Sequence, residues 1–470
     1  LFDVERIEVL KGPQGALYGR NAIGGAINIE TRRPGNKLEG FAGTSYGSGN
    51  TRELSAGLGG ALVDDRVLFR VAGLAKRSDG QLTNTYLDRK VDGVDRDDNL
   101  RGKLLIQASD DVQVDLRASS TEVAAGATYD SIVVDGNPAT IYAPRTNLLG
   151  RTDGRTQDAS AKIDVDLPLG RFTSITGYTD LRERYRGDVD FSNPVDLPGG
   201  FFGFGFQAGQ GQDLRVEMLS QELRLTSPDN QPVRWIAGLY HMDTQRRLDT
   251  RAFIDTDGTN AQYDDLSKVI VNNSEDNHNR ASAVFGQVDV DFSKAWTLSM
   301  ALRHDRDQRQ QTDLNSGNER AATYSKTQPK LTLTRRLDRD TVAYATASTG
   351  FRSGGFNAPG IPDFRAETLT NLEVGYKTVA LNGSLLLNTA LFAARSKDFQ
   401  YFLVDGVRLA QIISNIDRVD LNGLDIDWRW LPLRGLEIDG GLGVTDSTIK
   451  RNAAEPGSVG HHTPKSVPYK

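Results

Sequence analysis

The chain has 470 residues, of which 38 % are hydrophobic, 25 % are charged and 48 are glycine. The absence of cysteine excludes disulfide frameworks, thiolate metal sites and cysteine nucleophiles, and the net charge of -6 gives no basic surface for nucleic acid. No run of roughly 18 apolar residues occurs, which excludes a transmembrane helix but not a β-barrel, whose strands need only about 10 alternating residues.

Two short apolar strands with many turn residues between them fill the beginning of the chain. Ile7 and Val9 give the first strand a period-two apolar face, and Ile27 and Ile29 do the same for the second. Glycines between the strands mark backbone positions that need a positive φ or a close approach, namely Gly12, Gly15, Gly19, Gly24 and Gly25. The segment therefore predicts a compact strand-turn-strand module.

The rest of the chain contains about seventeen segments that alternate apolar and polar residues. In one clear case Leu424, Ile426 and Trp428 lie on one face while Asp425 and Asp427 lie on the other. A soluble antiparallel sheet with one wet face gives the same alternation, so the alternation alone does not distinguish it from a membrane barrel.

The connections favour the barrel, because short and long links alternate along the chain. Short turns are predicted at 64–65, 109–111, 168–170, 228–232, 293–295, 337–340, 380–383 and 432–435. The longest polar links between them are 77–97, 122–157, 184–212 and 247–277, and the exception is the short first link, 47–50. This order places the short turns at one end of the strands and the long loops at the other, which is typical of outer-membrane barrels.

All four tryptophans lie close to predicted short turns. They are Trp235, Trp296, Trp428 and Trp430. Amphipathic rings at this level are expected to form a girdle at the membrane interface.

The motifs at 7–13, 17–19 and 24–29 give residues 4–34 a close resemblance to the C-terminal part of the plug domain of TonB-dependent outer-membrane receptors. Segments 220–225, 349–357 and 367–377 also resemble barrel motifs of this family and occur in the family's order.

This resemblance implies an all-β fold, a transmembrane antiparallel β-barrel closed by a plug. Residues 1–36 would be the C-terminal part of the plug domain, and 37–470 a β-barrel with about 17 of 22 strands. We expect a fragment that lacks the N-terminal plug, with the segment that TonB would grip, and the last barrel strands. The chain opens without a secretion signal, which we interpret as truncation, and a barrel with these strands alone is expected to stay open.

The resemblance also implies a function. We expect an energy-coupled receptor in the outer membrane of a Gram-negative bacterium, monomeric, in contact with lipid, and driven by the inner-membrane protein TonB. Its ligand would be a ferric siderophore or another iron complex, with no cofactor and no enzymatic activity. The alternatives are a receptor for cobalamin or a carbohydrate, a passive porin, an outer-membrane hydrolase and an extracellular adhesin.

Two groups of residues are candidates for ligand binding. The resemblance places the loop with Tyr18, Arg20 and Asn21 near the ligand-facing apices of the plug, where an aromatic face and a hydroxyl are available. An exposed apolar cluster in a predicted extracellular loop is unusual unless it contacts a ligand or packs on itself. It contains Phe201, Phe202, Phe204 and Phe206.

Charged residues suggest a contact between plug and wall. Arg32 and Arg33 end the plug segment, and Glu222 and Glu373 lie on strands whose polar faces are expected to point inward. An arginine in a narrow lumen needs a carboxylate partner, so we expect plug-to-barrel ion pairs that release when the plug opens.

Metal and catalytic sites have little support. The segment 255–260 has oxygen ligands at alternate positions but no closing glutamate, so a turn is a better interpretation than a Ca²⁺ loop. The five histidines are scattered apart from the adjacent pair His461 and His462, and no serine elbow, zinc signature or P-loop occurs.

Overall fold

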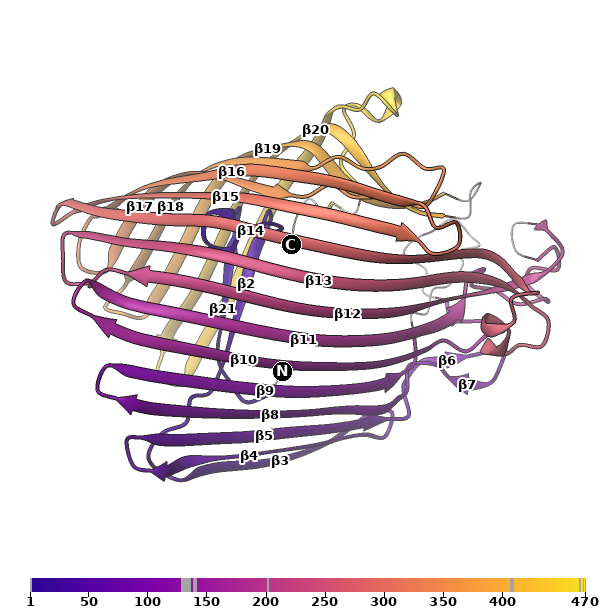
Figure 1. Ribbon diagram of the computed structural model, residues 1–470, viewed down its shortest axis with the longest axis horizontal. Coiled ribbons are helices and arrows are strands. Elements are labelled where there is room, and N and C mark those ends of the chain that lie inside the picture. Colours follow the sequence, from indigo (N-terminus) through magenta and orange to yellow (C-terminus); the bar gives the residue numbers. More distant parts are fainter. Residues whose placement is uncertain are drawn as a thin grey trace.

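A computed structural model describes residues 2–127, 137, 142–200, 203–405, 410–464, 466, 467 and 469 of the chain. It is almost entirely β-structure: long strands form a curved wall, and the N-terminal elements lie inside it (Figure 1). Among the described residues, no helix is long and apolar enough to cross a membrane.

The N-terminal elements form the predicted module. Strand β1 (Val4–Lys11) pairs antiparallel with β2 (Gly25–Thr31), and a one-turn helix, α1 (Gly15–Tyr18), lies between them. Ile7 pairs with Ile29, and Val9 with Ile27, which confirms the expected apolar face. The helical turn was not expected from the sequence.

The wall is an antiparallel sheet of seventeen strands, which confirms the number expected from alternation. The strands are β3 (Glu39–Gly47), β4 (Thr51–Val63), β5 (Val67–Ser78), β8 (Val94–Ser109), β9 (Val112–Ala125), β10 (Arg151–Leu167), β11 (Gly170–Asp188), β12 (Gln207–Thr226), β13 (Val233–Asp255), β14 (Val269–Ser293), β15 (Trp296–Asp313), β16 (Glu319–Arg336), β17 (Thr341–Arg352), β18 (Glu367–Ala380), β19 (Leu385–Asp405), β20 (Ala410–Leu433) and β21 (Leu436–Arg451).

The long connections carry a few short elements of their own. These are the hairpin of β6 (Thr83–Asn84) with β7 (Arg89–Lys90), and the 3-10 turns η2 (Asn260–Asp264) and η3 (Pro456–Ser458).

The two faces of the wall differ as the alternation predicts. The plug residue Lys11 contacts Asp427 and Asp425, which identifies their side of β20 as the lumenal face. The residues that alternate with them along the strand, such as Leu424 and Ile426, therefore face outward, where lipid can cover apolar side chains.

Short turns gather at one end of the wall. At the other end the strands run further than the sequence indicated: β13 continues to Asp255 and β14 begins at Val269, within the expected link 247–277. Both faces carry polar residues there, so the ladder continues without an apolar alternation to reveal it. The link 314–318 is a second short connection on the long-loop side.

The tryptophans lie beside the short turns, as expected. Trp296 begins β15 and stacks on Phe292 of β14 with ring centroids 6.2 Å apart. Trp235 follows the start of β13, and Trp428 and Trp430 precede the end of β20. An aromatic belt at this end is consistent with a membrane interface.

The strand order closes on itself, with β21 next to β3, which differs from the expectation of an open barrel. Among the described residues, paired registers run from β3 round to β21 without spanning this junction. The edge of β21 is instead met by His462, which bridges Thr448, and by Tyr469, which bridges Val444.

Candidate ligand-binding site

A cavity of about 490 Å³ lies between the plug loop that follows α1 and the lumenal faces of β12 to β15. Its lining combines plug and wall residues: Leu17, Tyr18, Gly19, Arg20, Asn21, Glu222, Arg224, Ile236, Tyr240, Met242, Phe285 and Arg303. Three arginines and two tyrosines in one concave site are suited to a ligand that is both anionic and aromatic.

The backbone of the plug loop holds Tyr18 at the edge of this cavity. The Tyr18 N–H donates to the Gln14 carbonyl over 3.0 Å, and the Asn21 N–H donates to the carbonyl of Phe351 on β17 over 2.8 Å. Gly19 between them has φ +85°, and a Cβ there would lie 2.8 Å from the Arg303 guanidinium. The loop is therefore fixed to the wall, while the Tyr18 side chain stays half exposed.

A buried ion pair joins this loop to the wall. The Arg20 guanidinium donates to Asp307 on β15 over 2.6 Å, and Asp307 is fully buried. Arg309 donates to the same carboxylate over 3.1 Å. Asp307 thus fixes the position of a cation that also lines the cavity.

A second buried ion pair, Arg303 with Asp305, lies next to Asp307 on the same face of β15. Arg303 donates to Asp305 over 3.0 Å, and Gln328 of β16 donates to Asp305 over 2.7 Å. The guanidinium also lies over the rings of Tyr240 and Phe285, 5.4 Å and 5.2 Å from their centroids. Packing between two rings keeps this cation oriented at the cavity wall.

Other junctions hold the plug hairpin at its two ends. At one end Lys11 donates to Asp427 over 3.0 Å and lies 3.4 Å from Asp425. Burial pulls the pKa of Lys11 down, but these two carboxylates outweigh it and leave the pKa above its ordinary value. At the other end Asp3 pairs with the buried Arg70 of β5.

Two models of known protein families match this chain. Residues 75–469 match the model described as TonB dependent receptor-like, beta-barrel, and residues 1–26 match the TonB-dependent Receptor Plug Domain. The chain belongs to the TonB-dependent receptor family. The two matches cover most of the wall and most of the plug segment that this chain contains.

Individual relatives of this TonB-dependent receptor are named for iron-related ligands or for pesticin. It is 24 % identical over 466 residues to the pesticin receptor of Yersinia pestis, an alignment that covers 94 % of this chain and 63 % of that protein. It is 37 % identical over 131 residues to the ferric enterobactin receptor PirA of Pseudomonas aeruginosa, covering 25 % of this chain and 17 % of that one. The receptor thus spans less than two thirds of the length of the curated relatives it matches.

A solved structure shares the fold. The ferric yersiniabactin uptake receptor FyuA of Yersinia pestis superposes with a TM-score of 0.80 at 19 % identity, covering 100 % of this chain and 70 % of that one. At this identity the likeness concerns the fold.

The structure brings part of the predicted site together. Tyr18, Arg20 and Asn21 line the cavity, and Glu222 lies on its opposite wall. The sequence did not single out Arg303 or Asp307. The sequence does contain a signal for them: charged residues occupy every second position from 303 to 309, and so share one face of a strand.

The predicted partners of Arg32 and Arg33 are wrong. Among the described residues, neither arginine pairs with Glu222 or Glu373. Glu222 instead lies 3.7 Å from Arg224, and Glu373 accepts a hydrogen bond from Tyr344 over 2.8 Å.

The reason is the orientation of the plug hairpin in the receptor. Arg32 follows β2 at the hairpin end where its carbonyl accepts a hydrogen bond from Lys103 of β8 over 3.1 Å. Glu373 of β18 lies beside Gly12 at the opposite end. The plug arginine and lysine that do pair with the wall are Arg20 and Lys11.

The phenylalanine loop is described in part. Phe204 and Phe206 stack with ring centroids 6.0 Å apart and planes inclined by 12°, and Phe204 is exposed. Phe201 and Phe202 lie outside the described residues. The visible part of the loop therefore packs on itself and still presents one ring to solvent.

The segment 255–260 forms a turn. The Asp255 carboxylate accepts the N–H groups of Asp257 over 3.1 Å and Gly258 over 2.8 Å. In the described part of the chain, no three histidine, aspartate or glutamate side chains gather as metal ligands.

Proposed function

We propose that this receptor imports a ferric siderophore or a similar iron chelate across the outer membrane of a Gram-negative bacterium, with energy supplied by TonB. The observation that supports the proposal most strongly is the cavity between the plug loop and the wall. It offers guanidinium groups for an anionic chelate and the faces of Tyr18 and Tyr240 for aromatic groups of the ligand. The names of the pesticin, ferric enterobactin and ferric yersiniabactin receptors support the same ligand class.

In this proposal Tyr18, Arg20 and Asn21 contact the chelate from the plug, and the phenylalanine loop, with Phe201, Phe202, Phe204 and Phe206, covers it from outside. Arg20 has two competing anions, the ligand in the cavity and Asp307 behind it. Bound ligand would therefore weaken the hold of the wall on the plug loop, which favours its release when TonB pulls. The receptor acts as a monomer in lipid and performs no catalysis.

The test is uptake of radiolabelled ferric chelates by cells that lack their own siderophore receptors and express the full-length receptor. We expect accumulation of at least one catecholate, hydroxamate or phenolate chelate, abolished when TonB is deleted. If cells took up cobalamin or an oligosaccharide and no ferric chelate, that compound would be the substrate and the proposal of iron uptake would be wrong. Passage of small solutes without TonB would indicate a passive porin.

A further inference from the structure

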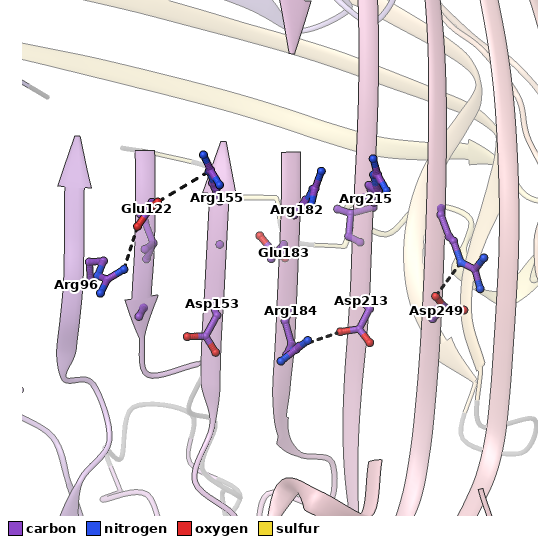
Figure 2. Close-up of a pocket in the computed structure, with 15 residues that line it drawn as sticks. Arg96, Glu122, Asp153, Arg155, Arg182, Glu183, Arg184, Asp213, Arg215 and Asp249 are labelled. Carbon is purple, nitrogen blue, oxygen red and sulfur yellow. Dashed lines mark hydrogen bonds and ion pairs between the residues drawn. The ribbon is translucent and has the colours of Figure 1, made fainter. Parts of the chain in front are cut away.

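Four arginines stand side by side on neighbouring strands near the long-loop end of the wall. In the ladder Arg155 of β10 pairs with Arg182 of β11, Arg182 pairs with Arg215 of β12, and Arg215 pairs with Arg247 of β13. Figure 2 shows the first three at one level of the sheet. We call these four residues the arginine row.

The arginine row lies on the outer face of the barrel. Glu222 of β12 and Tyr240 of β13 line the plug cavity and so mark the lumenal face of their strands. Arg215 and Arg247 are an odd number of residues away from them along the same strands, and side chains alternate between faces. The register then puts Arg155 and Arg182 on the same outer face.

Like charges directly opposite one another destabilise a sheet, and adjacent strands are only about 4.8 Å apart. Carboxylates on the same strands relieve part of this repulsion: Arg182 lies 3.2 Å from Asp180, and Arg247 lies 3.2 Å from Asp249. These carboxylates lie deeper than the cations, however, with Asp180 12 % exposed and Arg182 59 % exposed. Arg215 and Arg155 also have carboxylate partners, Glu217 and Glu122. Each guanidinium has five N–H donors, more than one carboxylate accepts, so donors remain for an external anion.

The position of the row relative to the membrane is defined by its neighbours. On the short-turn side the same outer face carries exposed apolar residues, Leu219 on β12 and Leu239 on β13, as lipid contact requires. On the other side the loop of η2 folds onto this face, because the Tyr263 ring lies 3.3 Å from the guanidinium of Arg186. The row thus lies at the level where lipid headgroups begin.

A shallow groove of about 450 Å³ runs along the row. Glu122 of β9 and Asp276 of β14 occupy the positions that continue the row on either side, so the run of cations is limited to four strands. Six arginines line or flank the groove: Arg96, Arg155, Arg182, Arg184, Arg215 and Arg247.

We propose that the arginine row binds the phosphate groups of a phosphorylated glycolipid in the outer leaflet. The positive charge of the row and its level at the edge of the apolar surface both fit this ligand. Planar guanidinium groups recognise phosphate by paired hydrogen bonds, and the acyl chains of such a lipid would cover Leu219 and Leu239 on the short-turn side of the row. The site is on the opposite face of the wall from the chelate cavity. It requires the outer-membrane location but not the identity of the transported ligand.

Native mass spectrometry of the detergent-purified receptor with lipid A that carries two phosphates tests this site. The double variant R182Q/R215Q removes the centre of the row. The matched control, R280Q/R395Q, removes two outward arginines of similar exposure, each 3.2 Å from an aspartate on a neighbouring strand. We expect the row variant to lose about tenfold or more of its lipid A affinity, and the control to keep it within about twofold.

A second measurement uses the unaltered receptor and is independent of how the variants fold. Dephosphorylated lipid A should bind about tenfold more weakly than the bisphosphorylated form, because only the acyl contacts remain. Equal binding of the two lipids, or equal losses in the row and control variants, would overturn the proposal. Chelate uptake by R182Q/R215Q should stay unchanged, so failure of this proposal is distinguishable from failure of the proposed transport function.

Discussion

Among the ion pairs that join the plug to the wall, Arg20–Asp307 and Lys11–Asp427 have similar N–O distances and very different surroundings. Arg20 and Asp307 are 2.6 Å apart with 14 % and 0 % of their side chains exposed, whereas Lys11 and Asp427 are 3.0 Å apart with 47 % and 54 % exposed. Solvent screens the second pair and not the first. The two junctions are therefore expected to differ in strength although both are salt bridges.

The difference concerns function as well as stability. Breaking a buried pair leaves an uncompensated charge, so the Arg20–Asp307 pair can act as a latch that keeps the plug loop on the wall. Breaking the exposed Lys11–Asp427 pair costs little free energy, because water replaces the lost contacts. Of the two pairs compared, the buried one lies at the cavity, because Arg20 is among the residues that line it. One buried hold on the plug is thus placed where a ligand can reach it, whereas the buried pair of Asp3 and Arg70 holds the other end of the hairpin.

Substituting Asp307 should have the largest effect. Asp307→Asn removes the charge that both Arg20 and Arg309 contact, and we expect the plug loop to lose about 3 to 5 kcal/mol of its resistance to local opening. Hydrogen exchange at the N–H groups of Tyr18 and Gly19, which are bonded within α1, measures this directly. Unchanged protection of these two amides would show that the buried pair is not a latch.

The plug hairpin offers a second test with a matched control next to it. Gly25 has φ +153°, and a Cβ there would lie 2.5 Å from the Leu10 carbonyl oxygen, whereas a Cβ on Gly24 would meet nothing within 4 Å. We expect Gly25→Ala to destabilise the β1–β2 pairing by about 1 to 3 kcal/mol and Gly24→Ala to change it little. Protease cleavage of the plug and entry of a large antibiotic into cells report the loosening. Equal behaviour of the two variants would contradict the clash.

Substitutions of Tyr18 can test ligand binding at the cavity without altering the Arg20–Asp307 ion pair. Tyr18→Ala should lower chelate affinity about tenfold by removing the aromatic face, and Tyr18→Phe should retain most of it. Because the half-exposed ring is not part of the Arg20 to Asp307 contact, hydrogen exchange of the plug should stay as in the unaltered receptor. Titration of intrinsic fluorescence with the ferric chelate measures the affinity. An unchanged affinity in Tyr18→Ala would remove this ring from the binding site.

The sequence predicted most of the fold because alternation is local. Ile7, Val9, Ile27 and Ile29 define the hairpin within a few residues, and about seventeen alternating segments define the wall. The ends of β13 and β14 on the long-loop side have polar residues on both faces, so their sequence shows no alternation and predicts a loop instead of strands. Closure was not expected, since the neighbouring places of β21 and β3 in the strand order depend on the three-dimensional curvature of the sheet.

The site was predicted only where a resemblance pointed to it. Tyr18, Arg20 and Asn21 follow from the plug motif, but the partner of Arg20 lies 287 residues away, and no pattern in one strand shows which plug residue it meets. The same limit explains the error with Arg32 and Arg33. Both were paired by charge alone, and the orientation of the hairpin in the lumen then placed them elsewhere.

The smallest effect is expected at the exposed junction, which makes it the control for the latch. Asp427→Asn removes one of the two carboxylates near Lys11, and Asp425 remains 3.4 Å from the ammonium group. Because the pair is screened, the plug should lose less than about 1 kcal/mol, and 1 M salt should abolish even this difference. Hydrogen exchange of β1 amides with and without salt measures both quantities. If Asp427→Asn loosened the plug as much as Asp307→Asn, burial would not be what distinguishes the junctions, and the hold on the plug would be shared along the hairpin.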